Sequence, residues 1–262
     1  MKTVVITGST RGIGFGLADS FLSMDCAVVI SGRNWPSVDK AINDLSTRHT
    51  AGRVYGHPCD VTNYDQIQLL WDAACNHYGQ VDIWINNAGT AHPQMPLWEH
   101  TPEELKMVIE TNLVGAVYGT KVAFTNMLKQ GFGAVYNMEG LGSTGRRVKG
   151  LALYGCTKAA LRYLNQSLAR EAEGSPVIVG ALRPGMVMTD LLSRQYINNP
   201  QEWERAKRIF NILADRVETV TPWLAAKVLA NKQNGIVISW TAGGKVFGRF
   251  LISPFHKRHV VD

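Results

Sequence analysis

The stretch that decides the fold is TGSTRGIG, residues 7–14. It follows an apolar run typical of a β-strand, Thr3–Thr7, and it opens a helical pattern over Ile13–Met24. Glycines at three of its positions permit a tight turn and let the backbone approach a pyrophosphate, while the N-terminus of the next helix offers N–H donors. A glycine pattern alone is weak evidence. Its place at the first strand–helix junction makes a dinucleotide-binding loop the preferred interpretation.

Downstream of this loop, short apolar runs alternate with helix-length segments. The runs are rich in valine and isoleucine, which is typical of parallel strands buried on both faces. We expect strands at Thr3–Thr7, Ala27–Ser31, Arg53–His57, Ile83–Asn86, Gly133–Asn137, Val177–Leu182 and Gly235–Ser239. With no internal repeat or linker, residues 1–262 are predicted to form one α/β domain. Its expected architecture is a doubly wound (Rossmann) fold, with a central parallel sheet of about seven strands flanked by helices.

Two of the predicted helices carry start signals. One spans Thr62–Tyr78, with Thr62 as the cap and Asp65 three positions later, a relative of the capping box. The other begins at Thr101 with the sequence TPEE, which supplies a threonine cap, a proline at the first helical position and two acids in the first turn.

Composition favours a soluble protein without metal. The 262 residues are 45% hydrophobic, and no apolar run approaches the roughly 18 residues of a membrane span. The first strand starts at once, which leaves no room for a signal or transit peptide, so we expect a cytoplasmic protein. Four cysteines lack any zinc spacing and are interpreted as reduced thiols, three of them packing residues. The net charge of +6 is interpreted as lysine and arginine side chains on the solvated surface, since no nucleic-acid recognition motif accompanies it.

The second predicted strand indicates which dinucleotide the loop would take. NAD enzymes usually carry an acid there to hold the ribose 2′-hydroxyl. This chain has Gly32, Arg33 and Asn34 instead, together with Arg11 in the glycine loop. Two cations without a carboxylate suit a 2′-phosphate, so NADP(H) is predicted over NAD(H), the alternative being that Arg33 is a plain surface charge.

These features combine into a resemblance. The TGxxxGxG loop, CDV at 59–61, NNAG at 86–89, TNLVG around Asn112, YxxxK at 154–158 and RPGMVMT at 183–189 resemble the short-chain dehydrogenase/reductase family over nearly the whole chain. The resemblance implies cofactor contacts from Gly8, Ser9, Thr10, Arg11, Gly12, Ile13, Gly14, Arg33, Asn34, Asp60, Val61, Asn87, Ala88, Gly89, Tyr154, Lys158, Pro184, Gly185, Val187 and Thr189.

The same resemblance assigns the chemistry of a carbonyl reduction. It implies that Tyr154 is the general acid, that Lys158 lowers its pKa and binds the ribose, and that Asn112 holds a water in a proton relay. The spacing agrees, because a phenol and an ammonium four residues apart share one face of a helix. A neighbouring ammonium is expected to move the pKa of a tyrosine from about 10 toward the working pH.

One family residue is missing. The usual serine would align with Leu141 by spacing or with Gly140 by the end of the strand, and neither has a hydroxyl. Ser143 is the favoured replacement as the donor that polarises the substrate oxygen, although a role in capping the next turn is nearly as well supported. Glu139 is interpreted either as a buried hydrogen-bonding carboxylate or as a second proton carrier.

This departure narrows the resemblance to one branch. Together with DIWINNAG, PGMVMTDLL and FNILAD, the glycines and acid at this strand exit are similar to the chlorophyll b reductases, which use NADPH to reduce a 7-formyl group to hydroxymethyl. The first hypothesis is therefore a pigment reductase. The second is an NADP(H)-dependent oxidoreductase of another bulky hydrophobic alcohol, aldehyde or ketone. The third is a non-catalytic dinucleotide-binding scaffold or redox sensor.

Two further segments are assigned by their position in this family. A substrate lid is expected at about 189–221, with apolar side chains that suit a hydrophobic small molecule such as a tetrapyrrole, although residues at such spacing are more often core. The tail at about 243–262 mixes phenylalanines with cations. It is expected either to touch a membrane surface or to pack on a neighbouring subunit of a homodimer or homotetramer, and we favour the subunit.

Overall fold

The computed structural model describes residues 1–196, 200–241, 249 and 258–261. Its centre is a seven-stranded parallel sheet with the order β3-β2-β1-β4-β5-β6-β7. The strands are β1 (Thr3–Ile6), β2 (Ala27–Gly32), β3 (Val54–Pro58), β4 (Ile83–Asn86), β5 (Gly133–Met138), β6 (Val177–Arg183) and β7 (Val237–Ser239). This confirms the predicted doubly wound fold. The strand order reverses between β1 and β4, the place where ligands bind in open α/β sheets.

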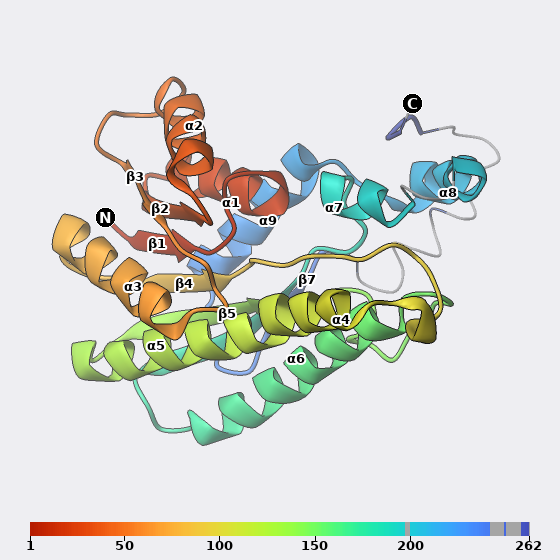
Figure 1. Cartoon of the computed structure of the whole chain (residues 1–262). Helices are drawn as coiled ribbons and strands as arrows, with labels where there is room; N and C mark the ends of the chain where they lie inside the picture. The colour runs from red at the N-terminus through yellow and green to blue at the C-terminus, as the bar shows by residue number, and fades with distance from the viewer. Residues whose placement is uncertain (197–199, 242–248, 250–257, 262) are drawn as a thin grey trace.

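Helices cover both faces of the sheet (Figure 1). One face carries α1 (Gly12–Leu22), α2 (Trp35–Ser46) and α9 (Val217–Ala230), and the other carries α3 (Tyr64–Tyr78), α4 (Pro102–Ile109), α5 (Gly115–Gln130) and α6 (Ala152–Glu171). A short 3-10 turn, Leu97–Glu99, precedes α4, and a π-helical turn, Glu110–Val114, joins α4 to α5. The predicted lid contains α7 (Asp190–Ser193), the 3-10 turn Arg194–Tyr196 and α8 (Pro200–Leu213).

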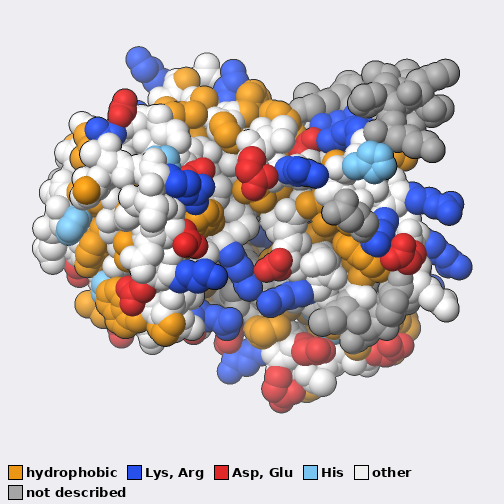
Figure 2. Space-filling view, turned by 90° about the horizontal axis from the view of Figure 1, so that it is seen from above, with side chains coloured by type: hydrophobic (Ala, Val, Ile, Leu, Met, Phe, Trp, Pro, Cys, Tyr) orange, Lys and Arg blue, Asp and Glu red, His pale blue; other side chains and the backbone are white. Residues whose placement is uncertain are grey.

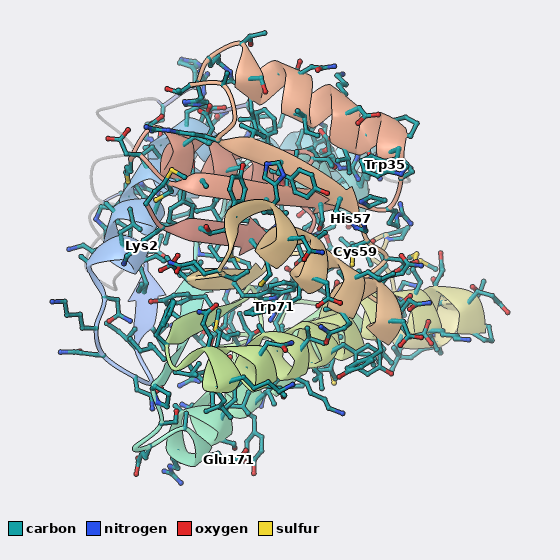
Figure 3. The ribbon with its side chains drawn as sticks, turned by 90° about the vertical axis from the view of Figure 1, so that its left-hand side faces the viewer. Lys2, Trp35, His57, Cys59, Trp71 and Glu171 are labelled. Atoms are coloured by element: carbon teal, nitrogen blue, oxygen red, sulfur yellow. The ribbon has the colours of Figure 1, made fainter. Side chains whose placement is uncertain are left out.

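Strand side chains alternate between two hydrophobic cores. Val4 and Ile6 of β1 pack with α1 and α9, whereas Val5 packs on the opposite face with α3 and α5. On that second face, Trp71 of α3 lies against the sheet, with its ring centroid 6.0 Å from that of Trp84 (Figure 3). The period of two along each strand therefore separates the helices into two layers.

A network of buried polar side chains ties the central strands to the helices below them. Asn86, at the end of β4, accepts a hydrogen bond from Trp84 (2.8 Å) and donates to Thr120 of α5 (3.0 Å) and to Asn137 of β5 (2.8 Å). Asn137 in turn donates to Asn165 of α6 (2.7 Å). Buried amides are costly unless they are paired, so this network fixes the ends of β4 and β5 relative to α5 and α6.

Helix caps bear out one sequence prediction and correct another. Thr101 caps α4 as predicted, and it also forms a complete capping box with Glu104. The predicted cap at Thr62 is wrong, because Asn63 accepts the N–H of Gln66 and α3 starts at Tyr64. Thr62 instead donates its hydroxyl to Asp60 (2.8 Å). Two adjacent residues were suitable caps, and the bond to Asp60 decides between them.

The four cysteines are free thiols. Cys26 and Cys59 are buried in the two cores and Cys75 packs against the second, which confirms three of them as packing residues. Burial raises the pKa of Cys59 to about 12, so that thiol stays protonated. Cys156 is exposed on α6.

Figure 2 looks down on the face that carries α1 and α9, where lysine and arginine side chains are interspersed with acidic ones.

Among the described residues, no helix is both long and apolar enough to cross a membrane. Within the same part of the chain, no group of three or more histidine, cysteine, aspartate or glutamate side chains is arranged to hold a metal ion.

The polar network depends on a glycine. A Cβ on Gly119 of α5 would press on the Asn86 amide and lie 3.1 Å from the Trp84 indole nitrogen. We expect Gly119→Ala to destabilise the fold by about 1–3 kcal/mol, because the added methyl overpacks the site. Gly155→Ala is the matched control, since its Cβ would meet only Gly142, at 3.9 Å. Urea unfolding of both variants measures the difference, and equal stabilities would contradict the role given to Gly119.

Candidate active site

The glycine loop packs against the end of β4 as closely as backbone can. Gly8 has φ +61°, and a Cβ there would lie 2.7 Å from the Cα of Ala88. A Cβ on Gly14 would lie 2.6 Å from the Gly8 carbonyl. The Asn87 amide donates to the carbonyls of Thr7 (3.0 Å) and Gly8 (2.9 Å). The loop thus has the glycine-lined cradle that a pyrophosphate requires at the start of α1.

Other predicted cofactor residues of this loop have different surroundings. Ser9 is fully buried, and its hydroxyl donates to Ile6 (2.6 Å) while accepting the Ser31 N–H (2.9 Å). Thr10 packs where a Cβ on Gly32 would be, so the loop touches the end of β2. Gly12 has φ +59° and is the first residue of α1, and Ile13 is the second.

The ends of β2 and β3 place the residues predicted around the adenosine half. Arg33 is exposed directly after β2 and makes no ion pair within the described part of the chain. Asn34 caps α2 by accepting the Ser37 N–H (3.1 Å). Asp60 accepts two hydrogen bonds from Thr62 through one oxygen, and its neighbour Val61 is buried.

The exit of β6 meets the glycine loop from the other side. Gly185 has φ +77° and lies against Thr241, one residue after Pro184. Val187 is buried and forms an isolated parallel bridge with Asp215. Thr189 approaches Gly12, whose Cβ would lie 3.5 Å from the threonine methyl. Residues from both ends of the chain therefore meet at this edge of the sheet.

The predicted catalytic pair lies in the first turns of α6. Lys158 is buried and donates to the Met138 carbonyl (3.0 Å), with its ammonium 5.8 Å from the centre of the Tyr154 ring. The end of β5 crosses directly over them. A Cβ on Gly140 would lie 2.7 Å from the Tyr154 hydroxyl and 3.4 Å from Lys158. The position that aligns with the family serine is thus filled by the phenol itself.

Burial dominates the acid–base properties of this pair. It raises the pKa of Tyr154 to about 12, opposite to the direction expected from the nearby ammonium. That expectation is wrong for the protein alone, because Lys158 directs its charge to the Met138 carbonyl and desolvation of the phenol outweighs it. Burial likewise lowers the pKa of Lys158 to about 8, against an opposing effect of the Glu139 charge.

Asn112 lies in the π-helical turn between α4 and α5, where the helix is widened. Its oxygen accepts the Thr90 N–H (2.7 Å) and its nitrogen donates to the Thr90 carbonyl (2.9 Å) and, weakly, to Thr157 (3.5 Å). The side chain therefore joins the segment after β4, which includes Gly89, to the helix of the catalytic pair.

Ser143 and Glu139 flank the Gly140 crossing. Ser143 is buried and its carbonyl accepts from Arg162 (2.8 Å), while its hydroxyl has no hydrogen-bond partner among the described residues. Glu139 is buried and its carboxylate binds Arg183 through two hydrogen bonds, of 2.5 and 3.1 Å. Of the two interpretations of Glu139, the geometry shows the buried hydrogen-bonding carboxylate.

The predicted lid is organised around aromatic rings and one carboxylate. Tyr196, Trp203 and Phe210 have ring centroids 5.6–5.7 Å apart. Asp215 is buried and accepts from Trp240 (2.6 Å) and from two arginines near the end of the chain. These are Arg249 (2.7 Å) and Arg258 (2.7 Å). The tail at about 243–262 was expected to touch a membrane or a neighbouring subunit, and most of it lies outside the described residues.

Sequence reasoning missed two histidines beside the catalytic helix. His92 and His100 are buried with ring centroids 4.4 Å apart, and His92 touches the backbone of Tyr154. No motif marks either residue. The nearest signal was the short loop HPQMPLWEH after the NNAG motif, whose polar residues were not assigned a role.

Comparison with known proteins is consistent with this geometry. A family model described as short chain dehydrogenase matches residues 2–199. The chain belongs to the short-chain dehydrogenase family. The match covers strands β1 to β6, the glycine loop and the helix that carries Tyr154 and Lys158.

Within the family, the chain resembles chlorophyll(ide) b reductases. It is 38% identical over 236 residues to the chloroplastic chlorophyll(ide) b reductase NOL of Oryza sativa subsp. japonica, covering 88% of this chain and 67% of that protein. It is 37% identical over 256 residues to the probable chlorophyll(ide) b reductase NYC1 of the same plant, covering 91% of this chain and 49% of that protein. The chain thus spans about half the length of the NYC1 protein.

A solved structure of ElxO with NADP bound superimposes with a TM-score of 0.79 at 26% identity. The match covers 91% of this chain and 96% of that one. The likeness extends over the parallel sheet and its flanking helices, and it confirms the oxidoreductase fold that the sequence predicted.

The packing at Gly140 predicts that the family serine cannot simply be restored. We expect both Gly140→Ser and Gly140→Ala to lower kcat at least about tenfold, because either Cβ displaces the Tyr154 hydroxyl. The assay is the rate of carbonyl reduction under saturating NADPH, with Gly155→Ala as the control. A Gly140→Ser enzyme that is as fast as the parent would show that a side chain at this position does not displace the Tyr154 hydroxyl.

The pKa of Lys158 is expected to set the pH above which activity is lost. With a pKa of about 8, Lys158 is charged below that pH and loses its proton above it, while Tyr154 keeps its own proton to about pH 12. We expect kcat/KM to fall as pH rises through about 8, and Lys158→Arg to move that fall upward because a guanidinium stays charged. A profile of kcat/KM between pH 6 and 10 measures both. An unchanged limit in the arginine variant would contradict the assignment.

Proposed function

We propose that this protein is an NADPH-dependent carbonyl reductase that converts the 7-formyl group of chlorophyll b, or of a related pigment, to hydroxymethyl. The observation that carries the proposal is the phenol of Tyr154, half-buried and still protonated, held opposite Gly140 and beside Lys158. The similarity to chlorophyll(ide) b reductases supports the pigment as substrate.

In the proposed reaction the reduced nicotinamide supplies a hydride to the carbonyl carbon. Tyr154 then gives its proton to the carbonyl oxygen, and the ammonium of Lys158 stabilises the phenolate that remains. Asn112 holds the segment after β4 against α6 and would position the water that returns the proton. Ser143 has a free, buried hydroxyl next to the crossing, which suits a donor to the substrate oxygen.

The glycine cradle fits the dinucleotide. Its positive φ angles and its contact with Ala88 leave no room for side chains, so backbone N–H groups would meet the pyrophosphate. We propose the contacts expected from the sequence, with two qualifications. Asn34 would contribute through its backbone, because its side chain binds Ser37. Ser9 would act by shaping the loop, because its N–H binds Ser31 and its hydroxyl binds Ile6. NADP is favoured over NAD by the exposed, unpaired Arg33 and by the absence of an acid after β2.

The lid supports an apolar substrate. Its three aromatic rings build a hydrophobic segment over residues 189–221, next to the exit of β6 that carries Thr189. A flat, hydrophobic carbonyl compound suits such a surface. Another bulky hydrophobic alcohol, aldehyde or ketone remains the alternative substrate class. The non-catalytic scaffold is disfavoured, because the buried Lys158 and the half-buried Tyr154 beside it are both retained.

We also propose that the protein is a homo-oligomer. A hollow of about 250 Å³ between α5 and α6 is lined by apolar side chains that include Val117, Phe124, Leu164 and Leu168. Apolar surface of this kind is commonly covered by another subunit. Size-exclusion chromatography with light scattering distinguishes a dimer or tetramer from a monomer.

The first experiment mixes purified protein with chlorophyll b in mild detergent and NADPH, and follows the products by chromatography. We expect a hydroxymethyl product, and a loss of at least about 1,000-fold in rate for Tyr154→Phe, since the proton donor is removed without loss of the ring. NADPH binding by the variant is the control for folding. Tight cofactor binding by the parent without any product would overturn the pigment as substrate.

The displaced serine has its own test. If Ser143 polarises the substrate oxygen, Ser143→Ala lowers kcat about 10-fold or more while the KM for NADPH stays unchanged. Thr144→Ala, at the exposed neighbouring position, is the matched control. A parental rate in Ser143→Ala would remove the hydroxyl from the mechanism and leave backbone N–H groups as the donors.

Arg33 predicts the cofactor preference. Because an exposed guanidinium can bind a 2′-phosphate bidentately, we expect Arg33→Ala to raise the KM for NADPH about 10-fold and to change that for NADH little. Arg48→Ala, which removes an equally exposed arginine at the far end of α2, is the control. Equal effects on both cofactors would show that Arg33 does not read the phosphate.

A further inference from the structure

The helix that carries Tyr154 starts without a cap of its own. Leu151 occupies the cap position of α6, and its side chain has no oxygen with which to accept a hydrogen bond. The first N–H groups of a helix have no partner within it, and a polar cap side chain normally accepts the one at the third helical position. In α6 that third position is Tyr154.

A histidine from a distant loop supplies the missing acceptor. The Tyr154 N–H donates to the Nε2 of His92, 62 positions earlier in the chain, at 3.3 Å. The other ring nitrogen of His92 lies 2.7 Å from the Pro93 carbonyl. A carbonyl can only accept, so Nδ1 carries the proton and Nε2 is left as an acceptor. The side chain is therefore neutral and in a single tautomer.

The ring of His92 is held from its far side as well. His100 lies edge-on to it, at 4.4 Å between centroids and 76° between planes. The Nδ1 of His100 pairs with Glu104 (3.1 Å), which also closes the capping box of α4. The two histidines thus form a buried brace between the start of α4 and the first turn of α6.

We propose that neutral His92 is a positioning residue that caps α6 through the amide of Tyr154 and thereby holds the proton donor in place. In this role it acts through the Tyr154 amide and needs no contact of its own with the substrate or the cofactor. Its effect on the rate rests on the proposed reductase function, whereas its capping of the helix does not.

Protonation would break this cap. A proton on Nε2 would set two donors against each other, His92 N–H and Tyr154 N–H, so the contact would turn from attraction to repulsion. The groups that face the ring are His100 from the segment before α4, Glu104 from α4 and the backbone amide of Tyr154 from α6. Burial lowers the pKa of His92 from its usual 6.5, as does His100, while the bond to Pro93 and the charge of Glu104 oppose the shift.

Because the pKa of His92 is lowered in the folded protein, acid conditions weaken the protein and neutral conditions do not. A histidine whose pKa is lowered by folding stays neutral at pH 7, so the cap is complete there. As pH falls below 6.5, the unfolded chain takes up a proton that the folded protein resists, so stability declines. The cap itself, and with it the position of Tyr154, is lost as pH falls further, through the lowered pKa of His92 in the folded protein. Activity is expected to decline on the acid side through this one residue.

Two variants separate the hydrogen bond from the space that the ring fills. His92→Gln keeps an acceptor oxygen that cannot be protonated, and His92→Phe keeps a ring without an acceptor. At pH 7.5 we expect His92→Phe to lower kcat about tenfold, the size of a lost cap, with the KM for NADPH unchanged. We expect His92→Gln to stay within about threefold of the parent and to lose the acid decline. His77→Phe, an exposed histidine at the end of α3, is the control.

A second measurement needs no substrate. Labelling with ¹⁵N-tyrosine gives one amide signal for each of the eight tyrosines, and the signal that vanishes in Tyr154→Phe identifies Tyr154. We expect its hydrogen exchange to be slow in the parent and in His92→Gln, and about tenfold faster in His92→Phe. In the parent alone, exchange relative to the other tyrosine amides should accelerate below pH 6.5.

The outcomes are distinct. Slow exchange in the glutamine variant, fast exchange in the phenylalanine variant and no pigment reduction by any of them would uphold the cap and sink the proposed substrate. Pigment reduction with equal kcat and equal Tyr154 exchange in all three proteins would overturn the cap and uphold the function. An acid decline that persists in His92→Gln would assign the pH dependence to another group.

Discussion

The buried amide network beneath the sheet is the constraint on which the site depends. Asn86 and Asn137 end neighbouring strands, and their partners Thr120 and Asn165 lie on the helices that continue to the reacting groups. None of these groups can reach water, so each must keep its protein partner. A shift of α6 along the sheet by one residue would break the hydrogen bond from Asn137 to Asn165. The helix that carries Tyr154 is thereby fixed in register before any cofactor or substrate arrives.

The absence of the family serine is a consequence of packing in this chain. The strand exit passes so close to α6 that the first residue of the crossing must be glycine, and Gly142, with φ +102°, is pressed against Gly155 in the same way. The phenol takes the volume that a serine side chain would need. A carbonyl reductase with this geometry has to polarise its substrate from a different direction, and the buried hydroxyl of Ser143 is available for that task.

The strands could be predicted from the sequence because each one is specified by its own short run of residues. The strands are short valine- and isoleucine-rich runs, and observed ends differ from the expected ones by no more than two residues, as at β7, expected from Gly235 and observed from Val237. The site residues could be predicted only where they belong to a recognisable sequence motif. The depth of burial that reverses the expected pKa shift of Tyr154, and the cap that His92 offers from 62 positions away, arise from tertiary packing that no local pattern encodes.

The carboxylate of Asp215 has a consequence for the order in which the chain folds. Burial alone would raise its pKa, but hydrogen bonds from Trp240 and from Arg249 and Arg258 hold that pKa below its usual value. Both arginines come after the last strand of the sheet in the chain. Until they are in place, a buried aspartate lacks its counter-charges, which is costly. The sheet can therefore form without them, while the segment around Asp215 becomes stable only when Arg249 and Arg258 have bound its carboxylate.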